Sequence, residues 1–273
     1  MAGLVSLTVD GAVATVTLEH AGKFNAMSRG MWVLLRTVFL ELQHMPGVRC
    51  VLLCGKDGHF CAGGDIAQYP DFRFDAATLR QFHEVEVWGA LQAMLDCDVP
   101  IVAAIEGNCM GAGVEIASCC DLRLAGASAR FGAPIARLGF PMAPREAALV
   151  GQAVGNTTAR AMLLAAEVFD ATHMQRCGFL TRTLADGETA DAAWAMAQRM
   201  AALAPQAARL NKQTLRAIST PNRAFPPAEC AQEAIKTIAN PVPSVALDPY
   251  AYADSAEHRE GITAFLEKRP PCF

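Results

Sequence analysis

Short strand-like runs separated by stretches with helical periodicity are the feature that most limits the fold of this chain. Three runs can be read directly, at residues 48–54, 101–105 and 122–124. Helical patterns lie between them, at residues 85–95 and from about residue 111. Because parallel strands need crossover connections, and helices usually provide them, the alternation predicts an α/β fold with a largely parallel, buried sheet.

An antiparallel hairpin is predicted before the first of these strands. Apolar residues alternate through residues 4–18, and Asp10-Gly11 interrupts them with residue types that favour a tight turn. Ser28 is then suited to cap a helix. The apolar side chains of that helix recur at helical spacing and are predicted to face the core: Met31, Leu34, Leu35, Val38 and Leu42.

The C-terminal part is predicted to be helical. From Pro144 onward the apolar pattern is nearly all helical, and residues 228–255 are expected to form an irregular connection to a last helix near residues 260–268. Helix ends are expected at Gly178, at Pro205 and in residues 221–227.

The charge balance argues against nucleic-acid and membrane partners. The 273 residues have a net charge of −4 and no long basic run, so no surface for a polyanion is expected. The first residues lack the basic and unbroken apolar segments of an export signal, and no apolar stretch reaches the ~18 residues of a membrane span. The protein is therefore expected in the cytoplasm.

The ten cysteines are expected to be reduced thiols, because the chain is long and carries no export signal. Cys50 and Cys54 lie in a strand-like run, and Cys119 and Cys120 lie in a segment of small and apolar residues, so burial is expected for them. No Cys/His cluster has zinc spacing, and no metal site is predicted.

Two glycine-bearing segments follow two of the predicted strands. Residues 60–66 (FCAGGDI) follow the strand that ends near Cys54, and residues 111–115 (GAGVE) follow the strand that ends near Ile105 and open a helix. Small residues let a ligand approach the backbone closely, and free N–H groups at a helix start can donate to a developing oxyanion. Taken alone, such segments are also typical of ordinary tight turns.

The residues of these segments are more specific than their glycine content. Phe60-Cys61-Ala62-Gly63-Gly64-Asp65 is similar to the F-x-A-G-x-D pattern of the enoyl-CoA hydratase/isomerase (crotonase) family, and residues 101–107 with 111–115 are similar to its second signature. Further matches are Asn25-Ala26, residues 131–134 (FGAP), Leu138-Gly139 and residues 260–269. The resemblance covers almost the whole chain in the family's order.

The resemblance implies a crotonase-like spiral of β-β-α units with a helical C-terminal trimerisation region. It implies an acyl-CoA thioester as substrate and no cofactor besides the coenzyme A of that substrate. Residues 1–200 would form the acyl-CoA-binding core. Residues 201–273 would supply much of the contact in a homotrimer or a hexameric dimer of trimers, which agrees with 52% hydrophobic against 18% charged residues.

The resemblance also assigns catalytic groups. The N–H groups of Gly64 and Ala112 would form an oxyanion hole that polarises the thioester carbonyl and stabilises an enolate. Glu115 matches the first catalytic glutamate of the family's hydratases, and on a helix that begins at Ala112 its carboxyl can return toward the thioester. A structural ion pair is the alternative role for Glu115.

Further residues are predicted to bind the substrate. Lys23 and Lys268 could meet the phosphates of coenzyme A, although each is equally consistent with a solvated surface charge. The other predicted contacts come from the two glycine-bearing segments and from more distant positions: Ala62, Gly63, Asp65, Ile66, Gly111, Ile135 and Phe265.

One position departs from the family pattern. After the Phe-Gly-x-Pro segment, where the hydratases carry their second catalytic glutamate, this chain has Ile135, which cannot transfer a proton. The glycine-rich stretch that usually follows is replaced by residues 140–146 (FPMAPRE). Ordinary two-glutamate hydration is therefore in doubt.

Several groups could take the missing role, and each also has an ordinary explanation. Glu146 at a helix start is favourable for the helix dipole alone, and a run such as His83, Glu84 and Glu86 is usually a solvated face. Asp65, beside the first donor, is the remaining candidate.

The reaction expected from this pattern moves a proton with one retained glutamate. Enoyl isomerisation, or an enolate reaction with a substitute acid, is expected ahead of ordinary hydration. Decarboxylation or C–C cleavage through the same enolate and a non-catalytic acyl-CoA binder are alternatives, and the presence of Glu115 argues against the last. Residues 69–86 and the C-terminal segment are expected to line the acyl pocket.

Overall fold

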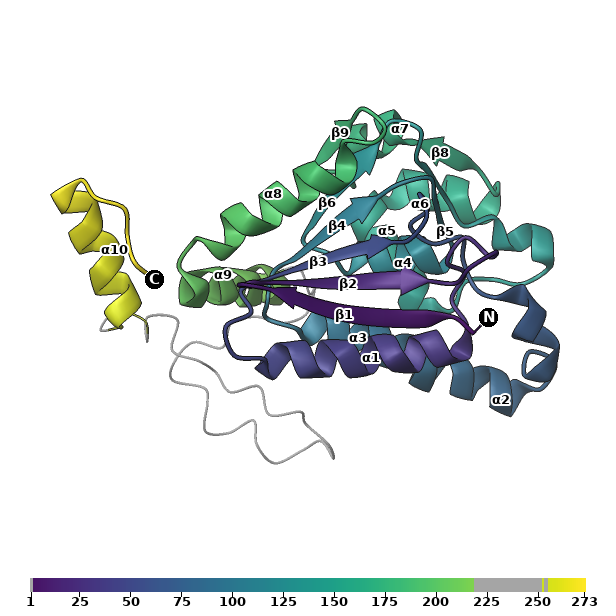
Figure 1. Ribbon diagram of the computed structural model, residues 1–273. Coiled ribbons are helices and arrows are strands. Elements are labelled where there is room, and N and C mark those ends of the chain that lie inside the picture. Colours follow the sequence, from purple (N-terminus) through teal and green to yellow (C-terminus); the bar gives the residue numbers. More distant parts are fainter. Residues whose placement is uncertain (1, 219–251, 253–254) are drawn as a thin grey trace, which may run out of the picture. The chain divides into compact units, whose positions relative to one another are not determined.

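The computed structural model describes residues 2–218, 252 and 255–273 (Figure 1). The chain divides into two compact units, Met1–Ala202 and Leu203–Phe273. The roles predicted for residues 1–200 and 201–273 stay predictions. The helix end expected in residues 221–227 and most of the connection expected at residues 228–255 lie outside the described residues.

The first unit is built on a six-stranded sheet in the order β1-β2-β3-β4-β6-β9. β1 pairs antiparallel with β2 as the predicted hairpin, and the other neighbouring strands pair in parallel. Figure 1 shows the resulting twisted sheet. The strands are β1 (Leu4–Asp10), β2 (Val13–Glu19), β3 (Cys50–Gly55), β4 (Ile101–Ile105), β6 (Leu122–Gly126) and β9 (Arg182–Leu184). The predicted α/β fold with a largely parallel sheet is confirmed.

The two faces of this sheet are covered by different helices. Helix α8 (Thr189–Ala201) packs on one face, and α1 (Arg29–His44) and α3 (Trp88–Asp96) pack on the other (Figure 1). Alternate residues of the central strands therefore belong to two separate apolar clusters. The cluster under α8 contains Val13, Cys50, Leu52, Val102, Ala104 and Leu124.

Helix α1 begins where the sequence predicts. The Ser28 side chain accepts a hydrogen bond from the Met31 N–H at 3.3 Å. The predicted buried face needs one correction, because Leu34 is 36% exposed whereas Trp32 and Phe39 are fully buried. The larger aromatic side chains bury more apolar area, which turns the helix toward them.

A second sheet of three short strands stands beside the first. It has the order β5-β7-β8, formed by β5 (Asn108–Met110), β7 (Arg130–Gly132) and β8 (Val168–Asp170). The prediction that the chain is nearly all helical from Pro144 onward is therefore wrong at β8 and β9. Three-residue strands are too short to show a periodicity, and they form because β7 and β6 offer them backbone partners.

The remaining described elements connect the sheets or follow them. They are η1 (Ile66–Asp71), α2 (Ala76–Gln81), η2 (Phe82–Val87), α4 (Ala112–Ser118), η3 (Pro134–Leu138), α5 (Pro144–Val154), α6 (Asn156–Leu164), α7 (Ala171–Arg176), α9 (Pro205–Ile218) and α10 (Ala256–Glu267). Helix α10 begins earlier than predicted, because Ser255 accepts a hydrogen bond from the His258 N–H.

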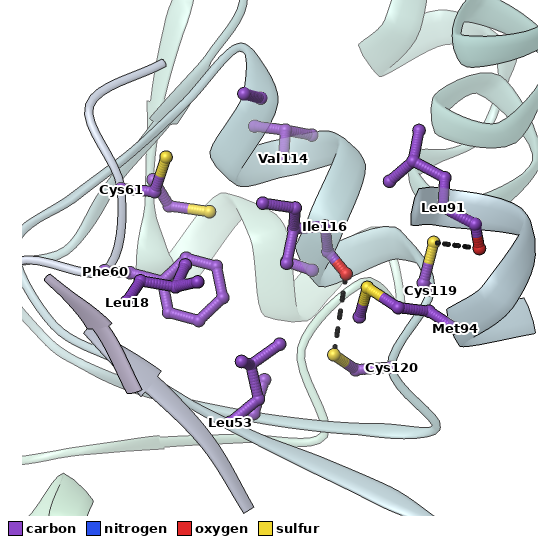
Figure 2. Close-up of a cluster of buried hydrophobic side chains, with 14 of the residues drawn as sticks. Leu18, Leu53, Phe60, Cys61, Leu91, Met94, Val114, Ile116, Cys119 and Cys120 are labelled. Carbon is purple, nitrogen blue, oxygen red and sulfur yellow. Dashed lines mark hydrogen bonds between the residues drawn. The ribbon is translucent and has the colours of Figure 1, made fainter. Parts of the chain in front are cut away.

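Helix α4 is anchored deep in the main core. Val114 and Ile116 are fully buried, and Figure 2 shows them among core side chains from the sheet and from α3. After the helix, the Cys119 thiol donates to the carbonyl of Leu91 at 3.8 Å, and the Cys120 thiol donates to that of Ile116 at 3.5 Å. The side chains at the start of α4 are therefore held in fixed positions.

None of the helices in the described part of the chain is both long enough and apolar enough to cross a membrane.

Candidate functional site

The two glycine-bearing segments of the sequence lie side by side. The Cys61 N–H donates to the Asn108 carbonyl at 2.8 Å, and the Met110 N–H donates to the Cys61 carbonyl at 2.9 Å. These bonds form a parallel bridge between Cys61 and Cys109. The bridge thus joins two backbone segments that are far apart in the sequence.

Close backbone contact at two glycines continues this bridge. Gly63 and Gly111 have φ angles of 111° and 48°, which side chains rarely allow. A Cβ added at Gly111 would stand 3.6 Å from the Gly63 Cα. The residues that follow the two glycines, Gly64 and Ala112, are thereby brought to neighbouring positions.

Both predicted oxyanion donors have free N–H groups. The loop around Gly64 is tied to Met27, because Met27 donates to the Gly63 carbonyl at 2.7 Å and Asp65 donates to the Met27 carbonyl at 2.9 Å. Within the described residues no acceptor takes the Gly64 N–H itself. Ala112 is the first residue of α4, so its N–H has no partner inside the helix. Their use as an oxyanion hole stays a prediction.

Glu115 lies in the first turn of α4, just after these donors. Its pKa is raised to about 8, first by burial and then by the carboxylate of Glu146, while the Arg73 charge lowers it. A carboxyl group that titrates near neutral pH is suited to both accepting and returning a proton.

An aromatic and basic cluster adjoins the Gly64 loop. A Cβ added at Gly64 would overlap the hydroxyl of Tyr69 in η1. The guanidinium carbon of Arg73 lies 4.4 Å from the centre of the Tyr69 ring and 3.7 Å from that of Phe140. Burial lowers the pKa of Arg73, and its Nε has no hydrogen-bond partner in the described part of the chain.

The sequence predicts that residues 69–86 line the acyl pocket, but it does not mark Tyr69, Arg73 and Phe140 as a cluster. No local pattern connects them, because Phe140 is distant from the other two in the sequence.

A hydrogen bond between His83 and the buried Glu146 links η2 to α5. His83 Nδ1 lies 3.1 Å from Glu146 Oε1, and His83 Nε2 lies 3.5 Å from an Arg73 nitrogen. Glu146, in the first turn of α5, is 2% exposed. The carboxylates of Glu115 and Glu146 are close enough to raise the pKa of Glu115.

The predicted solvated face at residues 83–86 is correct only in part. Glu84 is exposed and pairs with Arg145, as on an ordinary surface. The Glu86 side chain is 12% exposed, and its carboxylate accepts a hydrogen bond from the Arg29 guanidinium. The segment forms a π-helix, η2, whose extra residue per turn changes which side chains face inward.

The other predicted substrate contacts of the first unit differ in their surroundings. Lys23 Nζ contacts both oxygens of Asp65 at 2.8 and 2.7 Å, and Asp65 is 5% exposed. Ala62 donates its N–H to a loop carbonyl, Ile66 opens η1 with an exposed side chain, and Ile135 is half-buried in η3. Substrate contacts by these residues stay predictions.

Phe265 and Lys268 belong to the second unit. Phe265 is 82% exposed on α10, and Lys268 follows the helix with a φ of 56°. Substrate contact by Phe265 and Lys268 stays a prediction. Within the described residues, no group of three or more His, Cys, Asp or Glu side chains could hold a metal ion.

Two known proteins are similar in sequence to this chain over nearly their full lengths. The chain is 30% identical to the cyclohexa-1,5-dienecarbonyl-CoA hydratase of Thauera aromatica, covering 97% of this chain and 94% of that protein. It is 28% identical to the 2,3-dehydroadipyl-CoA hydratase of Escherichia coli strain K12, covering 96% and 94%.

The solved structures agree. An enoyl-CoA hydratase/carnithine racemase from Magnetospirillum magneticum superposes with a TM-score of 0.87 at 31% identity, covering 98% of this chain and 94% of that one. The predicted crotonase-like fold is therefore confirmed. The family model for enoyl-CoA hydratase/isomerase matches residues 8–273. The chain belongs to the enoyl-CoA hydratase/isomerase family.

Proposed function

We propose that this protein transfers a proton at the α-carbon of an acyl-CoA thioester through an enolate held by the N–H groups of Gly64 and Ala112. Glu115 is the proton-transfer residue. The observation that carries the proposal is the bridge between Cys61 and Cys109, which brings both donors and the first turn of α4 into one assembly.

The chemistry follows from these groups. Two N–H donors aimed at the thioester oxygen stabilise the negative charge that develops when the α-proton leaves or when a nucleophile adds to the β-carbon. One such donor contributes about 2.7–4 kcal/mol in acyl-transfer enzymes. Glu115 supplies or removes the proton, and its pKa of about 8 keeps both protonation states accessible.

The relatives support an unsaturated acyl group. Two are named as hydratases of a dienecarbonyl-CoA and of a dehydroadipyl-CoA. We therefore propose a 2-enoyl-CoA as the substrate class, with no cofactor beyond the coenzyme A that it carries. Isomerisation needs only Glu115, whereas hydration needs a second group, because Ile135 offers none.

Two measurements test the proposal. Calorimetry with crotonyl-CoA, butyryl-CoA and free CoA measures binding, and NMR in D₂O measures exchange of the α-protons of butyryl-CoA. Glu115→Gln keeps its size but cannot accept the proton, so it should bind as the wild type does and lose about 10²–10⁴-fold in exchange rate.

The matched control is Glu41→Gln, which changes an exposed glutamate on α1 and should leave both measurements unchanged. No binding of any CoA thioester at millimolar concentration would reject the proposal. Unchanged exchange in Glu115→Gln would remove this residue from the mechanism.

A further inference from the structure

The proposed reaction leaves Glu146, a buried carboxylate of the site, without a role. Glu146 is 2% exposed, and its only hydrogen-bond partner among the described residues is His83. Burying a carboxylate is costly unless it is paired. The buried carboxylate of Glu146, close to Glu115, is therefore a candidate for a further role in the reaction.

The contacts of His83 determine which of its ring nitrogens donates to Glu146. Arg73 has only donors, so the Nε2 of His83 must accept from it. The ring proton of a neutral His83 therefore stands on Nδ1 and is donated to Glu146 Oε1 at 3.1 Å. Glu146 is therefore the acceptor of this hydrogen bond.

Glu115 is in the opposite situation. Its side chain has no hydrogen-bond donor among the described residues, and the nearby charge of Glu146 disfavours a second ionised carboxylate. The environments of the two groups are therefore separate: Glu146 accepts a hydrogen bond from His83, and the pKa of Glu115 is raised to about 8. Such a separation is how two carboxyl groups divide acid and base roles in known enzymes.

Titratable and charged groups near Glu146 come from three other elements. His83 belongs to η2, Glu115 to α4, and Arg73 to the loop after η1. On the outer side, its neighbour Arg145 pairs with Glu84 at 3.3 Å. Helices α4 and α5 pack together, and each of the two carboxylates lies in the first turn of its helix.

We propose that Glu146 is the second proton-transfer residue of this site, replacing the ionisable group that Ile135 does not provide, with His83 as its positioning residue. The inference rests on the proposed function and extends it to hydration of a 2-enoyl-CoA.

The step balances with water as co-reactant. Glu146 takes one proton from water while the water oxygen bonds to the β-carbon, and the π electrons move into the thioester enolate held by Gly64 and Ala112. The enolate then takes the proton of Glu115 at its α-carbon. The proton on Glu146 returns to Glu115 through solvent, so both groups regain their starting states.

The experiment separates hydration from α-proton exchange. Hydration of crotonyl-, hexenoyl- and decenoyl-CoA is followed by loss of enoyl absorbance, and exchange of butyryl-CoA is followed in D₂O. Glu146→Gln should lose about 10²–10⁴-fold in hydration, a much larger loss than any change in exchange.

Two readouts exclude a merely structural role. Removing the charge of Glu146 should lower the pKa of Glu115, so the pH profile of exchange in Glu146→Gln should move to lower pH. His83→Leu removes the donor to Glu146 and should lower kcat for hydration while KM stays unchanged. His83→Asn keeps an N–H near the Nδ1 position and should restore kcat. Glu84→Gln, an exposed neighbour, is the control.

The outcomes distinguish the two proposals. Wild-type hydration in Glu146→Gln, or a joint loss of hydration, exchange and thermal stability, would overturn the role of Glu146 alone. Exchange without hydration of any probe by the wild type would also overturn it and leave the proposed function standing. A wild type that neither binds CoA thioesters nor exchanges their α-protons would reject both.

Discussion

The hydroxyl of Tyr69 lies directly against the backbone of Gly64. A Cβ added at Gly64 would overlap that hydroxyl and would stand 3.2 Å from the ring carbon that bears it. The first predicted oxyanion donor and the aromatic cluster with Arg73 are therefore in contact, and a change at one is felt at the other.

Gly64→Ala should reduce turnover without unfolding the protein. The new methyl group must displace Tyr69 or the loop, and a misplacement of about 1 Å can cost about 10²-fold in rate. Steady-state kinetics with crotonyl-CoA and a thermal melt measure the two effects. Gly151→Ala in α5, where a Cβ meets only a methyl group at 4.0 Å, is the control. Adding Tyr69→Phe should recover part of the loss, and turnover equal to the wild type in Gly64→Ala would contradict the contact.

The raised pKa of Glu115 predicts a pH-dependent stability. Its folded pKa of about 8 lies above the ordinary value of 4.5, so its contribution is fully present below about pH 4.5 and is lost as pH rises through about 8. Glu115→Gln cannot ionise. Its melting temperature relative to the wild type should therefore rise between about pH 5 and pH 9. A difference that is constant over this range would show that Glu115 does not carry the shift.

Arg73 is expected to set the pH range of activity. Its positive charge lowers the pKa of Glu115, so Arg73→Gln should raise that pKa and move the Glu115 limb of the exchange profile to higher pH. The pH dependence of kcat/KM measures the change. Arg145→Gln removes an exposed cation paired with Glu84 and should leave the limb in place. Equal shifts in both variants would indicate a general surface effect.

The pair of Lys23 with Asp65 makes Lys23 a structural residue as well as a predicted substrate contact. Lys23→Met leaves a carboxylate that is 5% exposed without its partner, so the free energy of unfolding should fall by about 1–3 kcal/mol. In an Asp65→Asn background the same change should cost less. Urea unfolding of the wild type, the two single variants and the double variant gives the coupling free energy between Lys23 and Asp65. A raised Kd for free CoA in the double variant would support the phosphate contact, and an unchanged Kd would limit Lys23 to the ion pair.

Self-association is the remaining expectation. Helix α10 exposes large apolar side chains, with Phe265 at 82% and Leu266 at 73%. We propose that a second copy of the chain covers them in a trimer or a dimer of trimers. Light scattering should report a multiple of the 29.0 kDa chain mass, and Phe265→Ser should reduce it. A wild-type mass of 29.0 kDa at micromolar concentration would refute this assembly.

The sequence by itself determined the elements whose signals are local. Ser28 caps α1 through a hydrogen bond three residues away, Asp10-Gly11 marks the first turn, and β4 occupies the predicted residues 101–105. The glycine-bearing segments identified the family, because their residues and order are specific. These features depend on neighbours along the chain, which a sequence displays directly.

Only the tertiary structure decided which side chains meet. His83 and Glu146 are 63 residues apart and form a pair because a π-helix and the first turn of α5 pack together. Trp32 is buried whereas Leu34 is exposed, and β8 and β9 form by pairing with β7 and β6. Burial and charge at a residue depend on groups from distant segments, so the pKa of Glu115 and the partner of Glu146 follow from packing, which no local pattern encodes.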